Sequence, residues 1–276
     1  MKNVAFGQYY PVDSILHRMD PRAKTVMAVL YVVCTFLCKN ALCFLALSLA
    51  VLLLAALSRI PIRLILSTIK PLIFILAFTS LFNVFGTQGA PENLLTPESW
   101  RIRIYEEGLW NALFMILRIV ILLASTGVFL TFTTTPIALT DAMEQLFSPL
   151  KKIRVPVHDI AMMTTIALRF IPTLAEETQK MMDAQKARGA DFSSGGLIKR
   201  AKALLPVFIP LLSSAFKRAD ELANAMDCRC YHGGEGRTRL KVLHFRGSDV
   251  MALLAVIAFG IGIFFLNRLG IGYTMK

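Results

Sequence analysis

Charged residues are scarce in this sequence: they make up 17% of its 276 residues, against about 25% in an ordinary soluble chain. Apolar residues reach 55% and fall in blocks. The segment 41–58 is apolar on every side, whereas a soluble core helix alternates an apolar face with a polar one. Because such a segment is stable only in lipid or among similar helices, the composition argues against a soluble domain and favours an integral membrane protein.

The sequence also lacks the motifs of a nucleotide-binding protein or an enzyme. The glycine cluster at 233–236 leads into Arg237 and Thr238, not into the Lys-Ser or Lys-Thr that closes a phosphate loop. The apolar segments hold no paired carboxylates of the kind that relay protons across membranes. We therefore expect no catalytic residue and no cofactor bound by this chain.

Cysteine is present, but in no pattern that builds a disulfide framework. The five cysteines are an odd number without regular spacing. Cys228 and Cys230 are separated by one residue and have no second pair, which is a poor zinc pattern, although His232 and His244 lie nearby. A pair of small residues in a turn is the simpler interpretation, and we expect no metal site.

The apolar blocks predict about five membrane spans, at 23–38, 41–58, 71–85, 108–132 and 249–266. The fold class is therefore all-α, a polytopic membrane helical bundle. Asp20 and Pro21 suit the N-cap and the first position of the first helix. Arg118 lies inside the fourth span, where it either faces a polar partner in the bundle or reaches towards the interface.

The distribution of charge predicts the orientation of the chain. The loop 86–107 carries four acids against two arginines and is expected outside. The stretch 133–248 has 17 lysines and arginines against 11 acids, which places it and the N-terminus inside. We expect an N-terminal membrane domain over 1–132, a cytoplasmic helical insert over 133–248, and a final span with the C-terminus over 249–276. The net charge of +12 then reflects membrane orientation and does not indicate nucleic acid binding.

Two apolar segments of the insert, 160–174 and 204–216, resemble spans but are shorter than the roughly 20 residues that a span needs. The first holds Arg169, and an arginine in mid-span costs roughly 2.5–3.5 kcal/mol on insertion scales. The second holds two prolines. We interpret both as amphipathic helices that lie against the membrane or against another protein.

Two predicted helices of the insert end alike, with an arginine between small residues: Ala187, Arg188 and Gly189, and later Cys228, Arg229 and Cys230. A basic residue at a helix C-terminus balances the helix dipole. Alternatively, each arginine is presented to a pocket on a partner, which small neighbours allow to approach closely. The residues alone leave both interpretations open, and the repetition is the main argument for the second.

These paired motifs resemble the Ala-Arg-Gly motifs of the transmembrane coupling (T) component of energy-coupling factor (ECF) transporters, the EcfT/CbiQ-like family. The segments 11–24, 168–192 and 204–231 resemble other parts of that family, so the similarity covers nearly the whole chain. The second motif departs from the pattern because Cys228 and Cys230 replace the usual Ala and Gly. Without Gly, a positive-φ helix end is more costly.

The resemblance implies an energy-coupling subunit of an ABC-type importer for vitamins or other micronutrients. Two cytoplasmic ATPase subunits would each receive one arginine, Arg188 or Arg229, and a membrane-embedded substrate-binding (S) subunit would rest on the same helices. The chain would be a non-catalytic, multi-pass protein of a prokaryotic cell membrane, with ATP and Mg on its partners. The transported substrate stays open, as does the choice between a shared and a dedicated module.

Two other functions fit this sequence less well. A stand-alone secondary transporter would need ionisable residues or broken helices near the midplane, and the spans offer little beyond Arg118. An integral membrane enzyme would need clustered His, Asp or Glu near one interface, and the sequence does not supply them.

Overall fold

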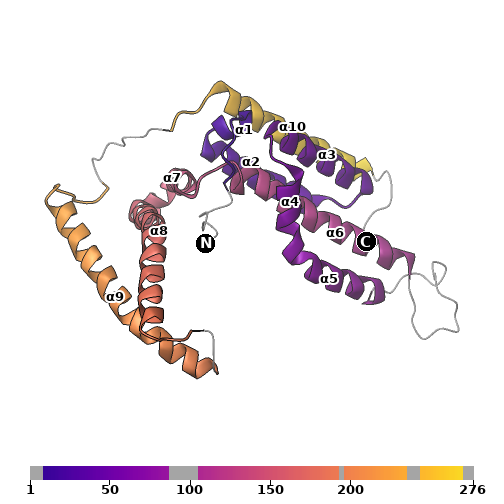
Figure 1. Ribbon diagram of the computed structural model, residues 1–276. Coiled ribbons are helices and arrows are strands. Elements are labelled where there is room, and N and C mark those ends of the chain that lie inside the picture. Colours follow the sequence, from indigo (N-terminus) through magenta and orange to yellow (C-terminus); the bar gives the residue numbers. More distant parts are fainter. Residues whose placement is uncertain (1–8, 87–104, 193–195, 235–242, 270–276) are drawn as a thin grey trace. The chain divides into compact units, whose positions relative to one another are not determined.

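The computed structural model describes residues 9–86, 105–192, 196–234 and 243–269, and its regular elements are helices (Figure 1). This confirms the all-α prediction for the part of the chain that the structure describes. The α-helices are α1 (Ile15–Arg18), α2 (Pro21–Leu37), α3 (Ala41–Leu57), α4 (Ile62–Ile69), α5 (Ile73–Gly86), α6 (Glu106–Thr126), α7 (Pro136–Leu146), α8 (Val157–Ala187), α9 (Leu197–Asp227) and α10 (Gly247–Leu269). Shorter turns are the 3₁₀ segments η1 (Lys70–Leu72) and η4 (Ser148–Ile153) and the π-helical segment η3 (Gly127–Thr131).

The chain divides into two compact units. The bundle unit holds the described residues up to 142 together with 243–269, and the hairpin unit holds those of 143–234. Helix α7 begins in the bundle unit and ends in the hairpin unit.

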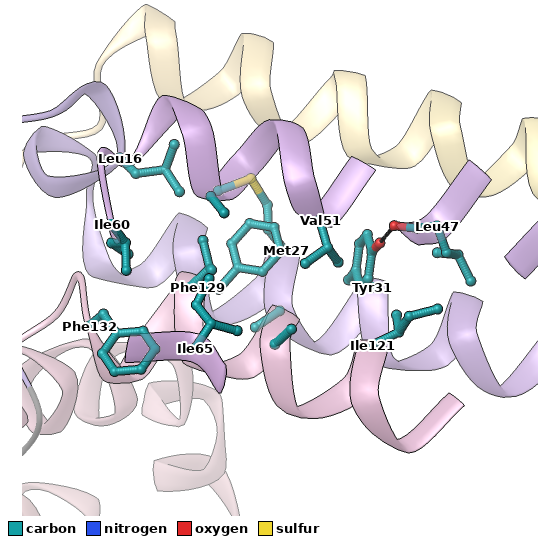
Figure 2. Packing of buried hydrophobic residues seen from close by; sticks show 14 of the residues in the cluster. Leu16, Met27, Tyr31, Leu47, Val51, Ile60, Ile65, Ile121, Phe129 and Phe132 are labelled. Atoms are coloured by element: carbon teal, nitrogen blue, oxygen red, sulfur yellow. Dashed lines mark hydrogen bonds between the residues drawn. The ribbon is translucent and has the colours of Figure 1, made fainter. Parts of the chain in front are cut away.

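The core of the bundle unit forms where α2, α3, α6 and α10 contact one another. The buried ring of Tyr31 on α2 lies 5.9 Å from the ring of Phe129 and 6.4 Å from that of Phe259. Its hydroxyl donates a hydrogen bond to the carbonyl oxygen of Leu47 on α3 (Figure 2). Because a buried hydroxyl needs a partner, this bond fixes α3 against α2.

Helix α2 begins where the sequence predicts. A carboxylate oxygen of Asp20 accepts a hydrogen bond from the backbone N–H of Arg22 at 2.8 Å, and Pro21 occupies the first turn. This arrangement satisfies one of the backbone donors that every helix start leaves free.

The sequence did not indicate that a lysine is buried at this helix start. The side chain of Lys24 is 1% exposed, and its ammonium donates to the carbonyl oxygen of Thr133 at 2.9 Å and to the hydroxyl of Thr134 at 3.4 Å. The buried carboxylates of Asp20 and Asp249 interact with it electrostatically. Since a buried charge is tolerated only when it is compensated and hydrogen-bonded, Lys24 holds the start of α2 to the segment after α6, with Asp249 at the start of α10 adding a favourable charge.

Within the described residues, three helices are long and apolar enough to cross a membrane: Ile62–Gly86, Glu106–Thr131 and Gly247–Arg268. Helix α3 is apolar but shorter. The predicted count of five spans therefore stays a prediction.

The predicted span 71–85 is part of a longer helical stretch that begins at Ile62, because Pro71 is accommodated in the first turn of η1. The predicted outer loop falls mainly on residues 87–104, outside those described.

Arg118 on α6 faces the bundle. Its guanidinium donates to the carbonyl oxygen of Cys38 at 2.9 Å and lies 5.5 Å from the ring centroid of Phe44. Of the two alternatives that the sequence left open, the structure supports a polar partner inside the bundle.

Candidate functional site

The candidate site lies on the hairpin unit, which consists mainly of two 31-residue helices, α8 and α9, that cross each other (Figure 1). The apolar segments 160–174 and 204–216 are parts of these helices, and neither helix is among the candidate spans. Pro172 lies inside α8, and two prolines lie inside α9 without ending it. Each proline removes one intrahelical hydrogen bond.

Helix α9 leaves a row of large apolar side chains exposed. The row consists of Leu204, Leu205, Phe208, Ile209, Leu212 and Phe216, each at least 45% exposed. These residues recur at intervals of three and four, so they lie along one side of the helix. Because soluble surfaces rarely expose a contiguous patch of this kind, this side of α9 is suited to cover by lipid or by a partner.

The two helices end with the same hydrogen-bond pattern. At the end of α8, the N–H of Gly189 donates to the carbonyl of Lys186, and the N–H of Ala190 donates to that of Gln185. At the end of α9, the N–H of Cys230 donates to the carbonyl of Asp227, and the N–H of Tyr231 donates to that of Met226. Each donor and acceptor of the second helix end lies 41 residues after its counterpart in the first. This is the Schellman arrangement, formed twice.

Cys230 adopts the backbone conformation that Gly189 adopts. The φ angle is +87° at Gly189 and +54° at Cys230. The left-handed region is costly for a residue with a Cβ atom, so the sequence alone does not favour the second helix end. The structure retains that end despite the cost, so the two motifs have closely similar backbones.

The predicted arginines occupy equivalent places in these two ends. Arg188 and Arg229 each precede the positive-φ residue, and both side chains are exposed. Among the described residues, neither guanidinium makes a hydrogen bond or an ion pair within the chain. The neighbouring Ala187, Cys228 and Cys230 are also exposed. The arrangement leaves two guanidinium groups available to carboxylate or carbonyl acceptors outside this chain.

Substitutions at the two positive-φ positions, Gly189 and Cys230, are expected to change stability in opposite directions. Gly189→Ala is expected to destabilise the hairpin unit by about 1 kcal/mol, and Cys230→Gly to stabilise it by a similar amount or less, because each adds or removes a Cβ atom in the left-handed region. Thermal unfolding of each variant in detergent measures both effects. If the unfolding midpoint moved in the same direction in both variants, the similar backbone geometry of the two helix ends would be contradicted.

Sequence reasoning missed the contact that joins the two helices. The guanidinium of Arg218 on α9 lies 2.7 Å from a carboxylate oxygen of Glu177 on α8, and the hydroxyl of Ser214 donates to the other oxygen at 2.7 Å. Nothing in the sequence around either residue shows that the two side chains meet.

The segment after α9 returns to the start of α8. A Cβ atom at Gly234 would lie 2.4 Å from the ring of His158, so only glycine permits this approach. The Nδ1 atom of His158 lies 2.9 Å from a carboxylate oxygen of Glu144. The role of Gly234 in the structure is therefore close packing against His158.

Comparison with known proteins identifies the family. A family model described as CbiQ, cobalt transport protein, matches residues 13–240. The chain belongs to the CbiQ/EcfT family. The energy-coupling factor transporter transmembrane protein EcfT of Ruminiclostridium cellulolyticum is 46% identical over 260 residues, 94% of this chain and 95% of that protein. The EcfT of Bacillus subtilis is 44% identical over 267 residues, 97% and 99% of the two chains.

Membership of the CbiQ/EcfT family confirms the resemblance stated from the paired motifs. It also accounts for the apolar helices of the bundle unit, because the relatives are transmembrane proteins of ECF transporters. The chain is thus a membrane-embedded component of a transporter. The six motif residues are placed by the structure at two matching helix ends, and their role stays a prediction.

Proposed function

We propose that this chain is the energy-coupling transmembrane subunit of an ECF-type importer. It would transmit ATP-driven motion from two cytoplasmic ABC-type ATPase subunits to a membrane-embedded substrate-binding subunit. The observation that carries this proposal is the pair of equivalent helix ends, each with an exposed arginine, at Arg188 and Arg229.

Each arginine would insert into a groove on one ATPase subunit. A guanidinium presents a planar set of donors that suits carboxylates and carbonyls, and small neighbours let the groove walls approach the helix end. Two similar ATPase subunits would need two similar contact sites on this chain. The two arginine motifs, whose backbones match, would supply them.

The exposed apolar row of α9 would support the substrate-binding subunit. That partner would be buried in the membrane and apolar, so it would match side chains such as Phe208 and Phe216. The prolines inside both helices leave backbone carbonyls without intrahelical donors and so lower the resistance of the helices to bending. The cargo would be a vitamin or another micronutrient, bound by the partner.

The rest of the proposal concerns location and cofactors. The chain would be a multi-pass protein of a prokaryotic cell membrane, with its N-terminus and its hairpin unit on the cytoplasmic side. ATP and Mg would be bound by the ATPase subunits, and this chain would be non-catalytic and hold neither.

Purification from its native membrane in mild detergent tests the proposal. An affinity-tagged chain is expected to retain two ATPase subunits and to stimulate uptake when the complex is placed in vesicles with a substrate-binding subunit. Recovery of the chain without ATPase subunits, under conditions that preserve its folded state, would contradict the proposed function.

A further inference from the structure

The contact between α8 and α9 joins equivalent positions of the two helices. Glu177 lies eleven residues before Arg188, and Arg218 lies eleven residues before Arg229. This is the same shift of 41 residues that relates the hydrogen bonds of the two helix ends. At 1.5 Å per residue, each arginine lies about 16 Å along its helix from the crossing contact.

The contact is built to be more rigid than the other ion pairs of these helices. The side chains of Glu177 and Arg218 are 21% and 36% exposed, and both carboxylate oxygens of Glu177 accept short hydrogen bonds. By comparison, Lys217 and Glu221 are 4.0 Å apart with side chains 80% and 65% exposed. A partly buried, charge-assisted pair holds its geometry better than a solvated one.

We propose that Glu177, Arg218 and Ser214 form the pivot about which α8 and α9 turn, so that both arginines move by matched amounts. This inference rests on the proposed function, because it concerns how motion at the two helix ends is linked. A contact at equal distance from both ends makes the two arms equal in length. A given change in the angle between the two helices at this contact then displaces both arginines by the same amount.

The three residues are positioning residues, since they act through Arg188 and Arg229. Loss of the pivot should therefore separate transport from ATP hydrolysis. In the reconstituted complex, Glu177→Gln is expected to retain the ATPase subunits and their hydrolysis rate while lowering uptake per ATP about tenfold, the scale of one charged hydrogen bond. The charge exchange Glu177→Arg with Arg218→Glu should restore most of the uptake, and the solvated control Glu221→Gln should leave it unchanged.

A second measurement tests the pivot on the chain without partners. Spin labels would be placed on the native Cys228 and on Lys186→Cys, with Cys230→Ser and the three cysteines of the bundle unit replaced by alanine. The distance distribution between the two labels is expected to be narrow, to broaden at least about twofold with Glu177→Gln, and to narrow again in the charge exchange.

The outcomes separate the two proposals. A distance distribution that Glu177→Gln does not alter overturns the pivot, whether or not ATPase subunits bind. Unchanged uptake per ATP in that variant, in a complex that transports normally, also overturns the pivot alone. A wild-type chain that retains no ATPase subunits overturns the proposed function instead.

Discussion

Uptake by the reconstituted complex should fall at least about a hundredfold when Arg188 and Arg229 are both replaced by glutamate, because each exchange sets a carboxylate against a groove that accepts a cation. In each single variant, uptake is expected to fall about tenfold, since the other arginine still contacts its ATPase subunit. The measurement is the initial rate of uptake into vesicles, with the amount of bound ATPase determined on the same preparation.

The exposed Lys202 on α9 provides the control for this experiment. Lys202→Glu reverses a charge on α9, 27 residues before Arg229, and is expected to leave uptake within about twofold of the wild type. Uptake and ATPase binding that stay normal in the double arginine variant would remove the coupling role from these residues.

Replacement of the buried Lys24 by methionine should destabilise the bundle unit by about 3–5 kcal/mol. Methionine keeps much of the volume but removes a cation that attracts the buried carboxylates of Asp20 and Asp249, and it leaves the carbonyl of Thr133 without its donor. Arg22, 3.9 Å from Asp20, stays in place, so Asp249 loses more than Asp20 does. Thermal unfolding in detergent should show this as a large fall in the midpoint.

The exposed Lys39 gives a matched control, and Lys39→Met is expected to change stability by no more than about 0.5 kcal/mol. Adding Asp249→Asn to Lys24→Met should recover part of the loss, since it removes one uncompensated charge. Equal midpoints for the Lys24 and Lys39 variants would mean that the buried pairing is not stabilising.

Local signals in the sequence predicted the features that depend on a few neighbouring residues. Asp20 and Pro21 marked the start of α2, and Gly189 marked the end of α8, because a cap needs only a side chain or a glycine at one position. The helix end at Cys230 has no such signal, since a cysteine at positive φ is costly. The structure forms it because the remaining hydrogen bonds of the Schellman arrangement are all present.

Long-range contacts could not be predicted in the same way. Lys24 is held by Thr133, more than a hundred residues along the chain, and its own neighbours resemble the basic flank of a span. Glu177 and Arg218 are likewise surrounded by ordinary helical sequence. The only signal for their contact is the shift of 41 residues between the two arginine motifs, and it becomes informative once the helices are known to cross.

The sequence predicted two long helices that end at the two arginine motifs, whereas hydropathy alone delimits only the apolar segments 160–174 and 204–216 within them. Helices α8 and α9 extend well beyond both segments. Helix continues past a proline when surrounding contacts compensate for the lost hydrogen bond, and hydropathy does not report such contacts.

Photo-crosslinking from the two helix ends tests the central claim most directly. A photoreactive residue would replace Ala187 in one variant and Cys228 in another, in the complete complex purified from its native membrane. Each is expected to crosslink to an ATPase subunit, and a photoreactive residue at the exposed Phe74 of α5 is not. Crosslinks from Phe74 to an ATPase subunit, with none from Ala187 or Cys228, would contradict the account.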